Sequence, residues 1–95
     1  MLLGTRNITQ GDTRRVVIDY SGWLDKGVVL ETIAVSVPTG TTSTVQGATL
    51  SDDKRHAVFY VTGGNLNESF TVAVQITDSA SETVNDTLGF TVVTP

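Results

Sequence analysis

Apolar and polar residues alternate along much of this 95-residue chain, and residues that favour turns separate the alternating segments. Alternation with a period of two places successive side chains on opposite faces of a β-strand, whereas the spacing of three to four that marks a helix is rare here. The cleanest case is FTVAVQIT, from Phe70 to Thr77. Because Val, Ile and Thr fit a pleated, half-buried surface, the pattern predicts an all-β protein.

About seven short strands joined by turns are typical of an Ig-like or fibronectin-III-like antiparallel β-sandwich, and we predict that fold. The expected strands span residues 2–8, 14–20, 28–37, 43–46, 55–61, 70–77 and 83–93, with a further short piece at 48–50. Residues 13–95 are expected to form the single sandwich domain, and residues 1–12 an N-terminal arm or an edge strand. The residues expected to face inward are Val16, Ile18, Tyr20, Ile33, Val35, Val37, Ala57, Phe59, Val61, Phe70, Val72, Val74, Ile76, Leu88, Phe90 and Val92.

Three connections carry specific expectations. Ser21 to Asp25 is expected to form one helical turn, which Gly27 ends by accepting a positive φ. Pro38 ends the third strand because it has no N–H to donate to a ladder. Gly63-Gly64 is not followed by a helix, so we expect a hairpin turn there and not a phosphate-binding loop.

Composition narrows the classes of partner. The net charge is −4, which argues against nucleic acid and anionic membranes, since both are bound through clustered Lys and Arg. No run of apolar residues approaches the ~20 that a membrane span needs. Charged residues are 17 % of the chain, below the usual ~25 %, and the chain is rich in Thr. Such a surface fits a protein that contacts other proteins, or an ordinary sandwich with a Thr-rich face.

No constellation of residues indicates catalysis or a cofactor. His56 is the single histidine, no nucleophile–base pair can be assigned, and there is no cysteine. Asp52 and Asp53 are the first candidates for a calcium site, but no D-x-D-x-D-G loop is present and Asp is common in turns. We therefore predict a protein that is not an enzyme, with no catalytic, cofactor or metal residues.

Trp23, the single tryptophan, has two interpretations: a corner residue that caps the open end of the core, or an exposed anchor for a partner. A short apolar N-terminal segment can likewise dock on a neighbouring subunit or form a strand in its own domain. The candidate partner-interface residues are Leu2, Leu3, Arg14, Arg15, Tyr20, Trp23, Leu24 and Tyr60.

The order of motifs resembles a known class of protein. DYSGWLDKG (residues 19–27) is followed by IAVSVP (33–38), by FYVTGG (59–64), by FTVAVQIT (70–77) and by LGFTV (88–92). This order resembles small structural proteins of tailed bacteriophages, of the fibre–tail adaptor or head-decoration type, in which a W-L-D/E-x-G corner and a strand reading like V-W-L-S-G-G recur. The resemblance covers about residues 13–93.

The resemblance implies a non-enzymatic virion component, made in the cytoplasm of the bacterial host and present in many symmetric copies. Such a protein would dock on capsid, connector, tail or fibre proteins as an adaptor or decoration protein. The alternative is a bacterial surface adhesin or carbohydrate-binding sandwich, in which Tyr20, Trp23 and Tyr60 would stack on sugar rings.

Overall fold

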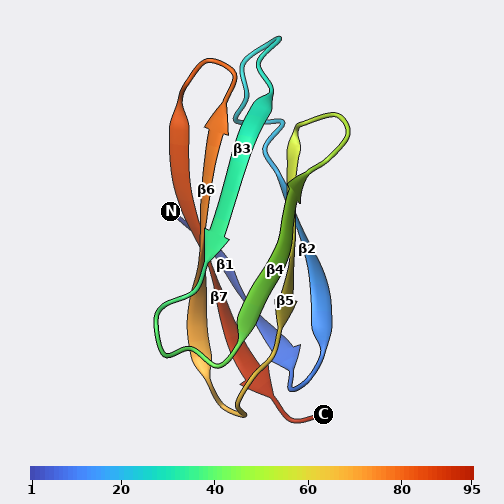
Figure 1. The fold of residues 1–95 in the computed structure, drawn as a ribbon, viewed down its shortest axis with the longest axis vertical. Helices are drawn as coiled ribbons and strands as arrows, with labels where there is room; N and C mark the ends of the chain where they lie inside the picture. The colour runs from blue at the N-terminus through green and yellow to red at the C-terminus, as the bar shows by residue number, and fades with distance from the viewer.

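The computed structural model describes residues 1–95 and contains seven strands and no helix. The strands are β1 (Leu2–Thr9), β2 (Thr13–Asp19), β3 (Leu30–Ser36), β4 (Thr44–Leu50), β5 (His56–Thr62), β6 (Ser69–Asp78) and β7 (Thr83–Val93). A four-stranded sheet has the order β1-β7-β6-β3, and a three-stranded sheet the order β2-β5-β4. The sheets form the two layers of an elongated sandwich (Figure 1), which confirms the predicted all-β fold. The structure contains no helix long and apolar enough to span a membrane.

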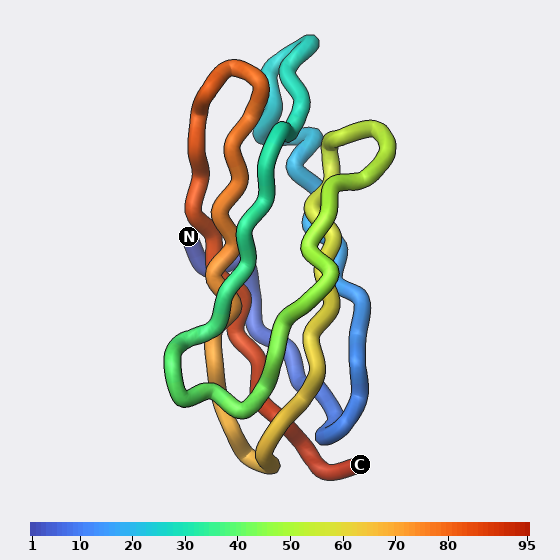
Figure 2. The backbone as a smooth tube through the Cα atoms, viewed as in Figure 1, coloured from blue at the N-terminus to red at the C-terminus, as the bar shows by residue number.

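One pair of strands departs from the expected antiparallel arrangement. β1 runs parallel to β7, with Asn7 beside Thr91 and Thr9 beside Val93, and the Gln10 N–H extends the ladder to the Val93 carbonyl at 2.9 Å. Figure 2 shows the blue N-terminal strand running beside the red C-terminal strand. Only a tight turn forces neighbouring strands to be antiparallel, and no turn joins these two segments from opposite ends of the chain.

The core lies between the sheets and contains the residues whose alternation predicted an inward position. The inward side chains of β6 are 0–6 % exposed, and Phe70 stacks on Phe90 with ring centroids 5.5 Å apart. Phe59 is fully buried on β5, the central strand of its sheet. Burial of a side chain of this size contributes about 1.5–3 kcal/mol. Ile33 and Val35 on β3 and Ile18 on β2 are only partly buried because both strands are edge strands, and Val37, just past β3, is also partly buried.

The two short pieces expected at residues 43–46 and 48–50 are one strand, β4, with an irregular register between Gln46 and Thr49. Gly47 adopts a φ of 66°, and the ring of Tyr60 lies 3.0 Å from the position that a Cβ on Gly47 would take. A bulge bends a strand without ending its pairing, so the turn-like composition of this segment was misleading.

The prediction of a hairpin at Gly63-Gly64 is wrong. This segment carries the chain from β5 in one sheet to β6 in the other. The Gly63 N–H donates to the Asp12 carbonyl at 3.0 Å, and a Cβ on Gly64 would lie 2.5 Å from the carbonyl carbon of Thr42. The glycines are needed here because neighbouring backbone segments occupy the space of a side chain.

The chain between β2 and β3 forms a tight turn, and no helix is assigned to it. The N–H groups of Trp23 and Leu24 both donate to the Tyr20 carbonyl, at 2.9 and 3.1 Å. Gly27 has a φ of 80°, as its position at the end of this turn predicted.

Candidate partner-binding seam

β1 and β2 are edge strands of different sheets, and they face each other along one side of the sandwich. Two pockets lie between them. The first, of about 210 Å³, is lined by Met1, Leu3, Ile18, Asp19, Tyr20, Trp23, Val84 and Asp86. The second, of about 110 Å³, is lined by Arg6, Asn7, Ile8, Arg14, Arg15, Val16 and Phe90. We call these two pockets together the β1–β2 seam.

The first pocket presents apolar side chains on a fixed base. Trp23 is 38 % exposed and Leu3 37 %, whereas Tyr20 is 5 % exposed and meets the Trp23 ring edge-on at 6.2 Å. The Tyr20 hydroxyl donates to Asp86 Oδ2 at 2.9 Å, and Asp86 is itself buried. Burial and this acceptor raise the pKa of the Tyr20 phenol above its ordinary value. Trp23 therefore packs against the buried ring of Tyr20, which is fixed by its hydrogen bond to Asp86.

Short polar contacts around the turn after β2 hold Trp23 in place. The Ser21 N–H donates to Asp19 Oδ1 at 2.8 Å, and the Ser21 hydroxyl, by bonding to the same carboxylate, lowers the pKa of Asp19. The Arg55 guanidinium reaches the Ser21 carbonyl at 3.2 Å. Leu24 points into the core and is 8 % exposed. The turn thus buries Leu24 and leaves Trp23 partly exposed at the surface.

The second pocket gathers cationic side chains. Arg6 from β1 and Arg14 and Arg15 from β2 line it, and they are half of the six Lys and Arg residues of the chain. None of the three guanidinium groups makes an ion pair or a side-chain hydrogen bond within the chain. By contrast, Arg55 is hydrogen-bonded to backbone carbonyls. The seam therefore consists of an apolar pocket followed by a pocket lined with unpaired arginines.

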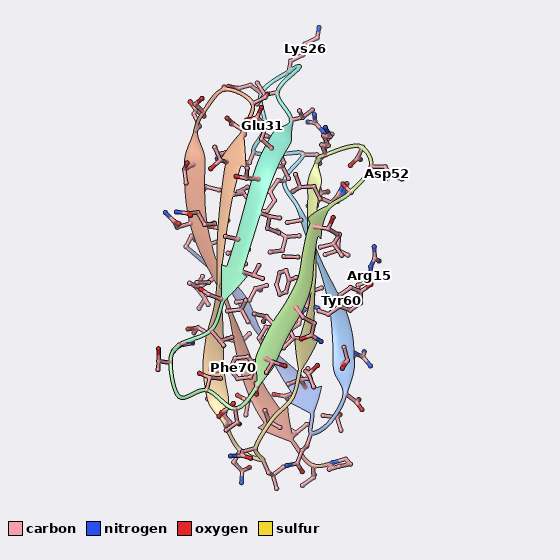
Figure 3. The ribbon with its side chains drawn as sticks, in the orientation of Figure 1. Arg15, Lys26, Glu31, Asp52, Tyr60 and Phe70 are labelled. Carbon is pink, nitrogen blue, oxygen red and sulfur yellow. The ribbon has the colours of Figure 1, made fainter.

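Tyr60 lies around the corner from the seam, on the outer face of the three-stranded sheet. It is 37 % exposed and is the cross-strand neighbour of Arg15, and Figure 3 shows these two side chains close together. The sugar-binding alternative needs several exposed aromatic rings on one face. Tyr20 is buried, while Trp23 and Tyr60 belong to different surfaces, so this arrangement does not favour it.

Two polar clusters outside the seam hold loops together. Glu68 accepts hydrogen bonds from the backbone and hydroxyl groups of Thr42 and Ser43, at 2.7–3.0 Å. These bonds, the one from the Thr42 N–H first, lower the pKa of Glu68 to about 2. Because the carboxylate is saturated by donors from one loop, we assign it the role of a clamp between that loop and the start of β6.

His56 lies between two carboxylates, with Nε2 3.4 Å from Asp19 Oδ1 and Nδ1 3.3 Å from Asp53 Oδ1. The Ser51 hydroxyl bonds to Asp53, and this bond is the main reason why the pKa of Asp53 falls to about 2. The serine thus faces a carboxylate and not the imidazole, which is not the order of a nucleophile–base pair. No group of three or more potential metal ligands is assembled, at Asp52 and Asp53 or elsewhere.

The structure brings together most of the candidate interface residues. Leu3, Tyr20 and Trp23 line the first pocket, and Arg14 and Arg15 line the second. Leu2 is 57 % exposed at the start of β1, next to the seam. Leu24 is buried behind Trp23, and Tyr60 is exposed on the adjoining face. Five of the eight candidates therefore line the seam, Leu24 supports Trp23 from the core, and Tyr60 lies on a different face.

Sequence reasoning missed Arg6 and Asp86. Asp86 follows the phase of Leu88 and Phe90, so alternation along β7 already placed its carboxylate inside. A buried carboxylate requires a donor, and this signal could have directed attention to a buried hydroxyl such as that of Tyr20. Arg6 had no such signal, because only the parallel pairing of β1 with β7 places it opposite Arg14.

Fold and seam together define a small β-sandwich with an apolar and basic surface along one side. The chain belongs to the podophage GP4 fiber-tail adaptor protein gp77 family, whose family model matches residues 9–91. This match confirms the resemblance to small structural proteins of tailed phages, and it makes the chain a phage tail protein with a structural role and a place in the virion.

A comparison with solved structures finds similarity to part of a much larger protein. The crystal structure of the 2,6-sialyltransferase of Vibrionaceae Photobacterium sp. JT-ISH-224, in complex with CMP and lactose, matches with a TM-score of 0.58 and 13 % identity. The match covers 100 % of this chain and 18 % of the sialyltransferase. At this identity the similarity shows the fold alone. No curated protein matches the chain.

Proposed function

We propose that this protein is a non-enzymatic, Ig-like adaptor that joins the tail and the fibre of a podophage, and that it docks on one of them through the β1–β2 seam. The observation that carries the proposal is the seam itself, where an exposed Trp on a buried base adjoins unpaired arginines. We further propose that it is made in the host cytoplasm and assembles in several symmetric copies around the tail axis. Docking on capsid or connector proteins would be a variant of the same role.

The chemistry of the seam supports a protein partner. Trp and Arg are enriched among the residues that contribute most to protein–protein binding, and a rigid aromatic ring loses little entropy when it is buried. Trp23 is held by its contact with Tyr20 and by the turn after β2, so it is presented in one orientation before binding. Truncation of such an anchor typically costs ~2 kcal/mol or more of binding free energy, which is about 30-fold in affinity.

The proposal is tested by binding of the purified protein to the tail and fibre proteins of the same phage. We expect Trp23→Ala and Leu3→Ala each to weaken binding to one of them by at least about tenfold. Leu66→Ala is the matched control, because Leu66 is 39 % exposed, like Leu3 at 37 %, but lies outside the seam on the loop between β5 and β6. Equal binding by Leu3→Ala, Trp23→Ala and the control would exclude the seam as the docking site.

A further inference from the structure

We infer that the seam takes an extended, acidic segment of the partner protein, which places carboxylates on the three arginines and an apolar side chain beside Trp23. This inference rests on the proposed docking at the seam and adds the chemistry of what binds there. It starts from the unbalanced charge of the second pocket, where Arg6, Arg14 and Arg15 meet with no carboxylate bonded to any of them.

The carboxylates of the chain do not supply the missing counter-charge. Glu68, Asp53 and Asp19 are bonded to serine, threonine or backbone donors within their own loops, and Asp86 is bonded to Tyr20. The protein as a whole carries a charge of −4, yet three of its six Lys and Arg residues line one pocket. An anionic ligand would give these arginines the partner that the chain does not, and the planar guanidinium group suits the carboxylate because it can bind both oxygens at once.

The backbone at the seam indicates the shape of the ligand. β1 pairs only with β7 and β2 only with β5, so the edges of both strands that face the seam lack a strand partner. Such an edge can accept another strand through backbone hydrogen bonds. An extended segment that runs along β1 passes both pockets, and its alternate side chains point into the seam.

The distance between the two pockets predicts how far apart the apolar and acidic residues of the partner segment should be. Leu3 marks the first pocket, and Asn7 lies in the middle of the three β1 residues that line the second. Four residues at ~3.3 Å each would separate the pocket centres by about 13 Å along a regular strand, and the irregular register between Leu2 and Thr5 shortens this distance. An apolar residue of the partner should therefore stand about four positions from a glutamate or aspartate, which is an even number and keeps both on one face.

A nucleic acid is the less favoured occupant. Its affinity grows with the number of phosphates neutralised by Lys and Arg, and the seam offers only Arg6, Arg14 and Arg15. Lys26 and Lys54 line neither pocket of the seam, and Figure 3 shows Lys26 at the tip of its loop. The first pocket also offers apolar side chains, which a phosphate backbone would leave unused.

The test uses the acetylated peptide Thr-Val-Leu-Thr-Val-Thr-Glu-Thr-Glu-Thr and its analogue with Gln in place of both Glu residues. Titration of the isotope-labelled protein should shift backbone amide signals of β1 and β2 with the Glu peptide and at least about fivefold more weakly with the Gln peptide. Equal shifts with both peptides, or no shifts in β1 and β2, would overturn the inference. So would tighter binding of a DNA duplex than of the Glu peptide.

Binding to the tail and fibre proteins supplies the second measurement. Arg6→Gln, Arg14→Gln and Arg15→Gln should each weaken binding about three- to tenfold at low salt, and the triple variant should also lose most of the salt dependence of the wild type. Lys54→Gln is the control, because it removes one positive charge from the loop between β4 and β5, which lines neither pocket, and it should bind like the wild type. Arginine variants that bind like Lys54→Gln would overturn the inference.

The two proposals fail in different ways. If Trp23→Ala and Leu3→Ala lose binding while the arginine variants keep it, the seam remains the docking site and the acidic segment is excluded. If none of these variants changes binding, the docking site itself lies elsewhere. The arginines are exposed, so the variants should fold, and circular dichroism with a thermal melt verifies this for each one.

Discussion

The hydrogen bond between Tyr20 and Asp86 fixes the base of the seam, and Tyr20→Phe tests its contribution. The O–H···O distance is 2.9 Å, and both residues are only 5 % exposed. Phenylalanine keeps the ring and its contact with Trp23 but deprives the buried Asp86 carboxylate of the hydroxyl donor, leaving the Met1 ammonium 3.5 Å from Oδ1 as its remaining partner. A hydrogen bond to a charged group contributes about 1.5–3 kcal/mol. We therefore expect a loss of about 2 kcal/mol in the free energy of unfolding, or roughly 8–16 °C in Tm for a domain of this size.

Urea unfolding followed by the fluorescence of Trp23 measures this difference directly, since the chain has one tryptophan. Tyr60→Phe is the matched control, because it removes the same atom from a phenol that is 37 % exposed and has no hydrogen-bond partner in the chain. The control should change stability by less than about 0.5 kcal/mol. If Tyr20→Phe is no less stable than Tyr60→Phe, the hydrogen bond does not stabilise the fold and the reasoning is refuted.

The same hydrogen bond should make the stability of the protein depend on pH in the alkaline range. Burial and the Asp86 acceptor raise the pKa of Tyr20, so the folded protein keeps the neutral phenol at a pH where the unfolded chain loses its proton. Stability is then complete below the unfolded pKa of ~10 and falls as the pH rises above it, by about 1 kcal/mol at pH ~11. Tyr20→Phe should lack this part of the alkaline decline, and parallel declines in the two proteins would contradict the assignment.

Two further predictions concern the loops. Hydrogen bonds from Thr42 and Ser43 lower the pKa of Glu68 to about 2. Their contribution to stability is therefore complete above the ordinary glutamate pKa of ~4.3 and is lost as the pH falls towards about 2. Glu68→Gln should remove this part of the loss of stability in acid. Tm measured across this window should drop less in the variant than in the wild type. Gly64→Ala should lower Tm by at least about 8 °C, because its Cβ would lie 2.5 Å from backbone, whereas Gly22→Ala, with open space, should stay within about 2 °C. Similar melting of the two alanine variants would contradict the close approach at Gly64.

Alternation predicted most of the strands and most of the core, because burial of one face of a strand leaves a direct mark on every second residue. It missed Ile8, Leu30 and Val58, which are also buried. The inward positions predicted along β6 and β5 are buried without exception. Turn chemistry was less informative. Gly63-Gly64 has the composition of a hairpin, but composition does not say whether the next strand joins the same sheet or crosses to the other. Gly47 similarly imitates a break where the strand only bulges around the Tyr60 ring.

The sequence predicted those residues of the candidate site that are close together in the chain, and it missed the contact between residues that are far apart. Trp23 and its support by Tyr20 are local in sequence, so a strand that runs into a Gly-flanked corner was enough to select them. Arg6 meets Arg14 only because β1 pairs in parallel with β7, more than eighty positions further along the chain. No period or motif encodes a pairing of that kind, since its register is decided by packing across the whole sandwich.

This pairing also divides the seam between two parts of the chain. β2 and the Trp23 corner lie within residues 9–91, the range matched by the adaptor family, whereas Leu3 and Arg6 come from β1, almost all of which precedes it. β1 and β2 are both edge strands whose backbones are paired on one side only. A partner segment that pairs along β1 would use its open edge and would bring Arg6 against the same carboxylates as Arg14. Recognition of the partner is therefore expected to need both strands, with β2 and the Trp23 corner supplying the half of the surface that lies within the family match and β1 the half that precedes it.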